Sequence, residues 1–438
     1  MRALKPYLAL AALWLVAAHA SATTDINGLY DARSHGMGGV GVAFVDSAGA
    51  IPINPALLDQ VGKLTVSADL FGIVSQAQVP YTVYHQNDDG TAYKNYETVR
   101  SKPNAGVLPF LGLAVRLHER VVFGSGIYPV FPQGVSSKFR PAPDQYPNTV
   151  ATNKAANLLV EAGEALAIRV FDNLSLAMMW RITYMTQTVS TPVTTGMLPA
   201  GVLLDPSRDP SNPSVVNAKQ SISGYNFKGF QFGALYKPLP NLRLGFSYRT
   251  RVDVWGDGNT TTMLAGSKIR IPTEGGLNNP HALRGGFAFT MLNDKLLLAG
   301  DFKYLFYAEA WKQIKQVRTN PGQMAMASYT PAHWYNSWVV ELGAEYKAHD
   351  IVRLRTGYTI LKSATNGNYA PAFVAPPGIS HVVMTGLGVK LGPSYDVDVA
   401  AGFSMLQSTV KTATEYNSGS GKYVQRGAQF SLSGSYRM

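Results

Sequence analysis

From residue 63 onward the chain divides into fourteen strand-like stretches whose connections alternate strictly between short and long. The short connections are residues 118–120, 171–173, 237–241, 291–294, 347–350 and 392–394. The long ones are residues 75–103, 132–155, 191–220, 255–280, 309–333, 363–380 and 409–422. An even number of strands with tight turns on one rim and long loops on the other is typical of bacterial outer-membrane barrels. The spacing therefore predicts an all-β fold, a 14-stranded antiparallel transmembrane β-barrel.

Apolar and polar residues alternate within these stretches, most clearly near the C-terminus. In residues 395–405, Tyr395, Val397 and Val399 share one face, and Asp396 and Asp398 share the other. The stretches are 10 to 17 residues long, which exceeds the usual five or six residues of soluble strands and suits a tilted membrane span of about 9–11 residues. Alternating lipid-facing and lumen-facing positions also explain 46% hydrophobic residues at near-zero mean hydropathy. A soluble secreted β-protein is the alternative.

Residues 1–22 have the features of a secretory signal peptide. Arg2 and Lys5 make the start basic, residues 7–18 form an apolar core, and Ala20-Ser21-Ala22 is a small-residue cleavage site. The core is shorter than the roughly 20 residues that a membrane-spanning helix needs. The signal indicates export, which is consistent with an outer-membrane location in a Gram-negative bacterium.

The composition excludes several kinds of chemistry. The absence of cysteine removes disulfides, thiol nucleophiles and cysteine metal sites. The histidines that follow the predicted signal peptide do not have the spacing of metal ligands; they are His35, His85, His118, His281, His333, His349 and His381. No G-x-S-x-G motif is present either. We therefore predict no cofactor, no metal site, no catalytic residue and no enzyme activity.

Without residues 1–22 the chain has 36 basic and 27 acidic side chains. A basic balance can indicate nucleic acid, but here the charges are scattered, which argues against that partner. Lining of the lumen and contact with outer-membrane lipid and lipopolysaccharide explain the charge better. Nothing in the sequence indicates a trimer interface, and we expect a monomer.

Two neighbouring strands place opposite charges on one face. In residues 334–346 and 351–362 the alternation puts Glu341 and Glu345 on the lumen side together with Arg353 and Arg355. Pairing across the turn at 347–350 makes them cross-strand neighbours. We predict a structural ion network in the lumen, since catalysis would need further partners.

Residues 23–62 differ from the rest of the chain, because they are rich in glycine and lack alternation. They contain Gly36-Met37-Gly38-Gly39-Val40-Gly41, which matches the G-x-G-x-x-G dinucleotide pattern. That pattern requires a preceding strand and a βαβ unit, and neither is predicted here. The glycines more plausibly allow tight turns and close backbone packing.

The run from Arg33 to Ala43, followed by Asn54-Pro55-Ala56-Leu57, resembles the N-terminal plug of the FadL family of outer-membrane transporters. The stretches Trp338 to Tyr346 and Arg355 to Tyr358 are similar to late strands of that family. The resemblance covers essentially the whole chain after the signal. It marks a set of plug-motif residues: Gly36, Gly38, Gly39, Gly41, Asn54, Pro55 and Ala56.

The resemblance implies three regions: a signal peptide (1–22), a plug or hatch inside the lumen (23–62) and the barrel (63–438). It also implies passive uptake of long-chain fatty acids or other hydrophobic small molecules. Extracellular loops would capture the ligand, an apolar pocket would hold it, and a gap in the barrel wall would release it. The chain departs from the family in its short loop at 191–220 and in ending without an aromatic residue. Like other such barrels, it would meet the barrel-assembly machinery during biogenesis.

A dry pocket would bind an apolar solute by burying surface, at about 25 cal/mol per Å². The candidate ligand-pocket residues are Ile51, Ile53, Leu57 and Leu58 from the plug, with Met179, Leu297 and Val339 on predicted lumen faces. Ordinary packing between plug and barrel is the alternative for each of them. Asn54 and Pro55 are expected to set a turn rather than to touch ligand.

Prolines indicate where the wall could open. If the turn near Glu119 sets the register, Pro109 on one strand lies opposite Pro129 on the next, which also contains Gly124 and Gly126. Proline cannot donate to the ladder, and the glycines would let the strand bend. We therefore predict a lateral gap at Pro109, Gly124, Gly126 and Pro129. A register slip, or prolines at the rims, is the alternative.

Other functions remain open at this stage: a general porin for polar solutes, and a structural or adhesive barrel. A porin would want an open, charge-lined lumen. The sequence does not identify the ligand. A carboxylate would favour a lumen cation, and there are six candidates: Arg181, Arg243, Arg249, Arg284, Arg353 and Arg355.

Overall fold

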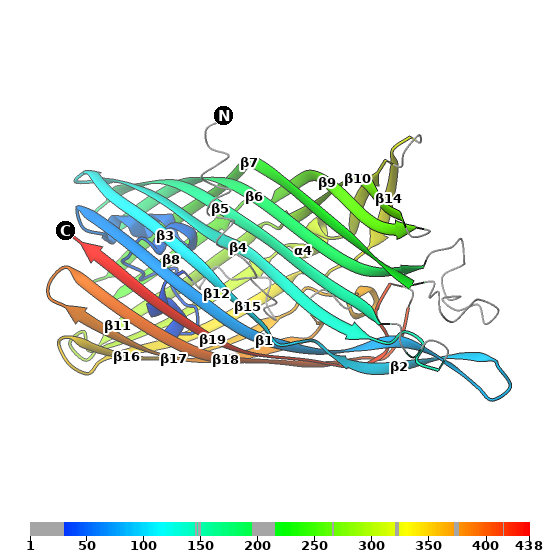
Figure 1. Ribbon diagram of the computed structural model, residues 1–438. Coiled ribbons are helices and arrows are strands. Elements are labelled where there is room, and N and C mark those ends of the chain that lie inside the picture. Colours follow the sequence, from blue (N-terminus) through cyan, green and yellow to red (C-terminus); the bar gives the residue numbers. More distant parts are fainter. Residues whose placement is uncertain are drawn as a thin grey trace.

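The computed structural model describes residues 30–144, 147, 150–194, 215–264, 267–319, 324–371, 376–414 and 416–438. The predicted signal peptide lies outside these residues. Within them the chain forms a closed, antiparallel 14-stranded β-barrel, which confirms the predicted fold (Figure 1). Strand β1 closes the barrel by pairing with both β3 and β19. The barrel strands are β1 (Leu64–Gln86), β3 (Asn104–His118), β4 (Val121–Phe139), β5 (Ala151–Phe171), β6 (Leu174–Thr194), β7 (Val215–Leu239), β8 (Leu242–Arg249), β11 (Ala282–Met291), β12 (Leu296–Leu305), β15 (Ser337–Lys347), β16 (Val352–Lys362), β17 (Ile379–Leu391), β18 (Tyr395–Val410) and β19 (Gly421–Arg437).

The short connections lie together at the rim that carries the C-terminus (Figure 1). The strand ends place turns at residues 119–120, 172–173, 240–241, 292–295, 348–351 and 392–394, as the spacing predicted. Because short turns of such barrels face the periplasm, this is the periplasmic rim and the opposite one is the outer rim.

The prediction of long loops was wrong in one respect, because much of the sequence in those ranges forms paired strands. Strand β2 (Ala92–Arg100) pairs with the outer part of β1. A second hairpin joins β9 (Val252–Leu264) to β10 (Ser267–Asn279), and a third joins β13 (Gln313–Arg318) to β14 (Met326–Pro331). Beyond the bilayer both faces of a strand can meet water, so the alternation disappears while backbone pairing continues. Of the predicted loop at 191–220, residues 195–214 lie outside the described part of the chain.

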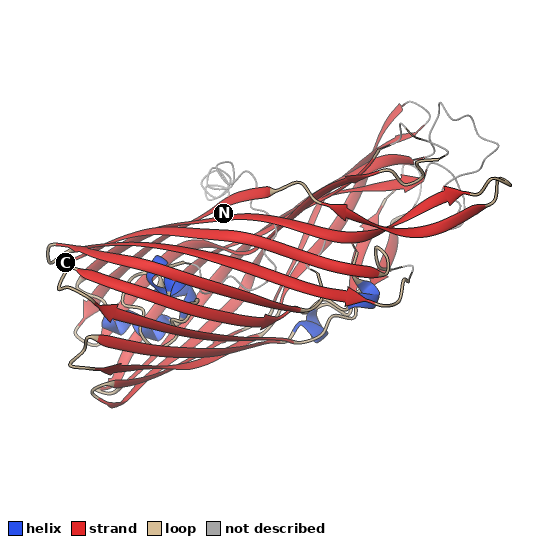
Figure 2. Cartoon of the chain, turned by 90° about the horizontal axis from the view of Figure 1, so that it is seen from below, coloured by secondary structure: helices blue, strands red, loops and turns tan. Residues whose placement is uncertain are grey.

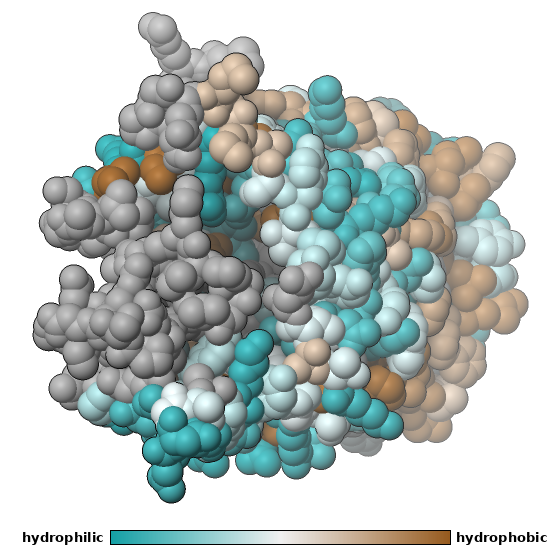
Figure 3. Space-filling model, turned by 90° about the vertical axis from the view of Figure 1, so that its right-hand side faces the viewer, coloured by the Kyte–Doolittle hydropathy of each residue, from teal (hydrophilic) through white to brown (hydrophobic). Residues whose placement is uncertain are grey.

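The side chains of the barrel strands follow the predicted faces. On β8, Leu244 and Phe246 are 41% and 48% exposed on the outer surface, whereas Ser247 and Arg249 are buried in the lumen. Figure 3, viewed toward the outer rim, shows polar residues nearest the viewer and apolar residues gathered on the wall behind them. The apolar outer surface is the one that lipid would cover.

Residues 30–62, which we call the N-terminal segment, lie inside the periplasmic half of the barrel (Figures 1 and 2). They form α2 (Ala32–Gly36), α3 (Ala50–Ile53) and the 3₁₀ helix η1 (Pro55–Gln60). Helix α2 contacts β16 to β19, and η1 contacts β4 to β7 on the other side. The other described helices are α4 (Tyr307–Ala310) and η2 (Gly367–Tyr369). No helix in the described ranges is long and apolar enough to cross a membrane.

Local hydrogen bonds explain why the N-terminal segment folds as it does. The side chain of Asp31 caps α2 by accepting from the backbone N–H of Ser34. Asn54 caps η1 by accepting from the N–H of Ala56, and Pro55 occupies the first turn, where no backbone donor is needed. These caps fix two short helices that are too short to be stable alone.

The glycine run seats the segment against the wall. Gly38 and Gly39 have φ of 83° and 86°, a region that residues with a side chain rarely adopt. A Cβ atom on Gly38 would lie 2.8 Å from the backbone nitrogen of Tyr358 on β16. The run therefore lets backbone approach backbone, and neither a preceding strand nor a βαβ unit accompanies it in the described part of the chain.

Candidate ligand site and wall opening

The wall between β3 and β4 is only partly paired. Near the periplasmic turn the two strands form a ladder whose last pair is Leu111 with Ile127. Beyond that pair, residues 104–110 of β3 remain bonded to β1, while β4 remains bonded to β5. Between Leu111 and Arg116 the register is the one that the turn predicted. Pro109 and Pro129 are therefore the residues that would face each other two positions beyond the end of the ladder.

The strand β4 is also irregular at this point. Its pairing with β5 shifts register between Pro129 and Phe131, which is the pattern of a β-bulge. Farther toward the outer rim the two edges meet again, where the N–H of Lys102 donates to the carbonyl of Ser136 at 3.0 Å. The stretch beyond the end of the β3–β4 ladder, which we call the wall opening, thus comprises residues 103–110 on one edge and 128–135 on the other.

Three aromatic rings lie on the lumen side of the wall opening. Phe110 belongs to the β3 edge, Tyr128 to the β4 edge, and Tyr30 to the N-terminal segment. The Tyr30 ring centroid lies 6.1 Å from that of Phe110 and 5.2 Å from that of Tyr128. The Tyr30 hydroxyl donates a hydrogen bond to the carbonyl of Pro129. Sequence reasoning missed Tyr30, because nothing in the sequence links it to a strand 99 residues away.

The two predicted glycines of β4 face the N-terminal segment. A Cβ atom on Gly124 would lie 2.6 Å from Leu58 Cδ1, and one on Gly126 would lie 3.4 Å from Ile51 Cδ1. We expected these glycines to let the strand bend. Their environment gives them a second role, because the missing side chains leave room for two apolar residues of the segment.

All seven candidate pocket residues are buried in one apolar cluster between the segment and the barrel; they are Ile51, Ile53, Leu57, Leu58, Met179, Leu297 and Val339. Met179 is near the wall opening, since the Tyr128 hydroxyl lies 3.7 Å from its sulfur. Leu297 and Val339 lie on β12 and β15. The seven residues are therefore spread over several contacts between the segment and the barrel and do not surround one open pocket.

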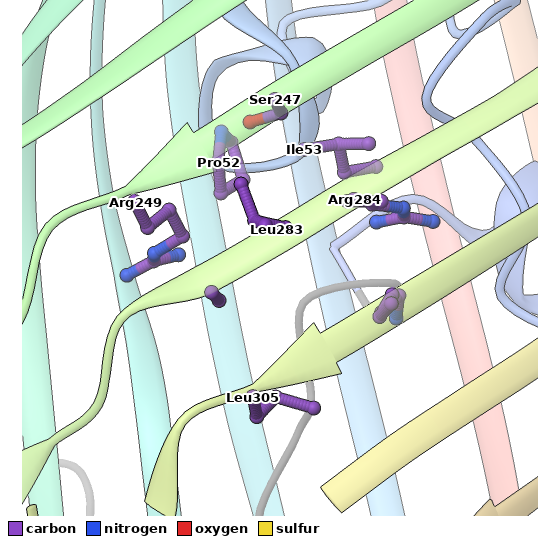
Figure 4. Close-up of a pocket in the computed structure, with 9 residues that line it drawn as sticks. Pro52, Ile53, Ser247, Arg249, Leu283, Arg284 and Leu305 are labelled. Carbon is purple, nitrogen blue, oxygen red and sulfur yellow. The ribbon is translucent and has the colours of Figure 1, made fainter. Parts of the chain in front are cut away.

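One small cavity borders the segment, with a volume of about 20 Å³ (Figure 4). Pro52 and Ile53 form one side, Ser247 and Leu283 the wall, and the cations Arg249, Arg284 and Lys303 lie at its edge. A space of this size holds about one water molecule. To enter this cavity, a ligand larger than water would need the segment, or side chains beside it, to move.

Ion pairs fix the N-terminal segment to strands of the barrel wall. Arg33 holds Glu345 through two hydrogen bonds of 2.8 and 2.7 Å, and Arg355 holds the same carboxylate at 2.7 Å. Arg33 also bonds Asp46, which in turn lies 3.2 Å from Arg437 on β19. Burial raises the pKa of Asp46, but the neighbouring guanidiniums of Arg33 and Arg437 outweigh it and keep the pKa well below its usual range.

The predicted ion network thus separates into two groups. Glu345 lies between Arg33 and Arg355, with Arg353 farther away at 4.0 Å. Glu341 instead bonds Lys303 and Arg284 at 2.7 and 3.1 Å. The second group also reaches the glycine run, because Arg284 donates to the carbonyl of Gly39 at 2.6 Å.

A further buried group was not predicted. Glu161 on β5 accepts from Arg181 and Arg249, both at 2.7 Å, and the side chains of Glu161 and Arg181 are completely buried. Both arginines were predicted from the sequence as lumen cations, but their shared partner Glu161 was not. The sequence signal for it was an acid, Glu161, among small and apolar residues at alternate positions of a long strand, on the face opposite to Glu164.

Acidic and histidine side chains do not form a metal site anywhere in the described ranges. The geometry instead consists of an apolar segment, an interrupted wall and ion pairs that fix the segment to the barrel. Residues 11–436 match the model of a family described as outer membrane protein transport protein (OMPP1/FadL/TodX). The chain belongs to this family.

Individual members are only distantly similar. Outer membrane protein P1 of Haemophilus influenzae is 22% identical over 394 residues, which cover 82% of this chain and 80% of that protein. A crystal structure of a Pseudomonas aeruginosa FadL homologue superposes with a TM-score of 0.72 at 17% identity, covering 93% of this chain and 98% of that one. The Pseudomonas putida toluene transporter TodX gives 0.68 at 16% identity, with coverage of 93% and 98%. At these identities the structures establish the shared barrel, and the family match establishes an outer-membrane transport protein of Gram-negative type.

Proposed function

We propose that this chain carries hydrophobic small molecules passively across the outer membrane, with long-chain fatty acids as one candidate class. Loops at the outer rim would capture the ligand. The apolar cluster around the N-terminal segment would hold it, with the segment acting as the plug. The wall opening between β3 and β4 would release it sideways.

The observation that carries this proposal is the end of the β3–β4 ladder at Leu111 and Ile127, beside an apolar part of the segment. Continuous ladder pairing is the rule in a membrane-spanning barrel, because the bilayer offers no water to its backbone groups, so a ladder that ends partway along two neighbouring strands calls for a functional explanation. A hydrophobic solute that leaves sideways enters the membrane directly and avoids the aqueous periplasm. Membership of the family supports the same class of cargo, since TodX is described as a toluene transporter.

A cross-link would test the route. The chain lacks cysteine, so Leu108→Cys with Val130→Cys provides the only thiols, one on each edge of the wall opening. A cross-linker with two activated-disulfide groups, which forms a reducible link to each cysteine, should lower uptake of a labelled long-chain fatty acid or of toluene, and reductant should restore it. The control pair is Val383→Cys with Phe403→Cys, which are paired across β17 and β18 and face outward.

The substrate class needs a separate comparison. Cells that express the chain should take up the fatty acid or toluene saturably, while a small sugar should enter no faster than in cells without it. Free sugar entry without hydrophobic uptake would make the chain a porin. If neither the hydrophobic solute nor the sugar enters faster than in cells without the chain, a structural or adhesive barrel is the remaining explanation.

A further inference from the structure

Tyr30 occupies a specific position at the wall opening. It connects to the β4 edge by its hydroxyl, which donates to the carbonyl of Pro129 two residues beyond the last β3–β4 pair. Its ring lies against Tyr128 on that edge and against Phe110 on the β3 edge. All three rings are at most 3% exposed. One side chain of the segment therefore bridges both edges where backbone pairing is missing.

The residues that follow Tyr30 are fixed to the protein elsewhere. Asp31 caps α2 and accepts a hydrogen bond from Ser47. Arg33 is bound to Glu345 on the far side of the lumen. Because these contacts hold the backbone just after Tyr30, its side chain can leave the wall opening without detaching the ion-paired part of the segment.

The contacts of Tyr30 are of a kind that an apolar solute can replace. A ligand between Phe110 and Tyr128 would bury the same apolar ring surface that Tyr30 now buries. It would not supply the hydroxyl, so the bond to Pro129 favours the closed state. A single neutral hydrogen bond of this type changes an equilibrium by about threefold to tenfold.

We propose that Tyr30 is the gate residue of the wall opening, with its hydroxyl bond to Pro129 as the latch and its ring as the wedge that a hydrophobic ligand displaces. The proposal rests on the lateral exit proposed above. Beyond that exit, the proposal identifies Tyr30 as the side chain that closes it and the Tyr30 ring as the group that the ligand must displace.

Two variants separate the latch from the wedge. Tyr30→Phe removes only the hydroxyl, whereas Tyr30→Ala removes the ring as well. Each is combined with Leu108→Cys, a buried position on the β3 edge, and the rate of labelling by a membrane-soluble maleimide is measured. We expect Tyr30→Phe to raise the rate about threefold to tenfold and Tyr30→Ala to raise it further. The matched control is Tyr423→Phe, because Tyr423 is also buried and its hydroxyl bonds Ser418 near the outer rim.

Uptake of the labelled hydrophobic solute is measured in the same variants. Wild-type labelling and wild-type uptake in both Tyr30 variants would overturn the gate. If the cross-link between the two edges, made in the Leu108→Cys, Val130→Cys variant, blocks uptake while Tyr30→Phe labels like wild type, the lateral exit stands and the gate fails. If the variants label faster while the cross-link leaves uptake unchanged, Tyr30 closes the opening but the proposed exit fails.

Discussion

Leu58 packs directly on the backbone of Gly124, so closely that a Cβ atom on Gly124 would lie 2.6 Å from Leu58 Cδ1. Ile51 lies on the same glycine, 3.2 Å from that Cβ position. The sequence led to two separate predictions, a ligand pocket and a gap in the wall. The contact of Leu58 and Ile51 with Gly124 joins residues of both predictions. Any change in the wall at Gly124 is also a change in how the N-terminal segment is seated.

The first prediction follows from this contact. Gly124→Ala should destabilise the protein by about 1–3 kcal/mol, because the added methyl overpacks a filled interior. Adding Leu58→Ala should recover part of the loss by making room for the methyl. The measurement is a double-mutant cycle on denaturant unfolding in detergent. Gly434→Ala is the control, since nothing lies within 4 Å of its Cβ position. Simple additivity of the two changes would contradict the contact.

The second prediction concerns the ion pairs of the segment. Arg33→Met should leave the buried carboxylate of Glu345 with fewer partners and cost about 3 kcal/mol. The loss should appear as faster hydrogen exchange of the α2 amides. The control is Lys347→Met, whose pair with Asp350 is exposed at 40% and 88% and should contribute less than about 1 kcal/mol. Equal effects of the two substitutions would show that burial of the Arg33 pair is unimportant.

The third prediction is an acid sensitivity of the segment. Burial lowers the pKa of His35, whose Nε2 lies 3.3 Å from Gln429 Oε1 and whose ring meets the edge of Phe71. Because the folded pKa is below the ordinary value of about 6.5, the stability from the neutral ring is complete above that pH and is lost as pH falls below it.

Thermal unfolding between pH 7.5 and pH 5 measures this effect. The unfolding midpoint of wild type should fall with pH more steeply than that of His35→Gln, which cannot titrate. Parallel curves for the two proteins would mean that His35 does not contribute to the pH dependence.

The fourth prediction addresses the buried triad. Glu161→Gln should cost about 3–5 kcal/mol, because it leaves the guanidiniums of Arg181 and Arg249 buried without a counter-charge. Glu164→Gln on the same strand is the control. It accepts a hydrogen bond from the hydroxyl of Ser125 at 2.9 Å, and should cost no more than about 1–2 kcal/mol. Comparable unfolding free energies for both variants would argue against a charge-stabilised triad.

The register at the end of the β3–β4 ladder, Leu111 with Ile127, could be predicted because it depends only on a short turn and on counting residues in two strands. The alternation of period two identified the lumen-facing charges for the same reason, since a face is a local property of a strand. The burial of Glu345 and Arg355 and their 2.7 Å contact follow from that pattern.

The partners of the N-terminal segment could not be predicted in this way. Arg33 reaches Glu345 across 312 residues, and no spacing rule connects them. Tyr30 and Pro129 are a similar case. The paired strands beyond the bilayer escaped prediction for a different reason, since water on both faces removes the apolar alternation that marks a membrane-spanning strand.

The incomplete β3–β4 ladder has a consequence for how the protein is made. A barrel without its N-terminal segment would present two strand edges beyond the end of a ladder, and two inward-facing glycines, to an empty lumen, and exposed strand edges are sites of aggregation. With the segment in place, Tyr30, Ile51 and Leu58 cover that region from inside. Insertion into the membrane and docking of the segment are therefore expected to occur as a single event. An empty barrel would be a dead end of biogenesis rather than an intermediate.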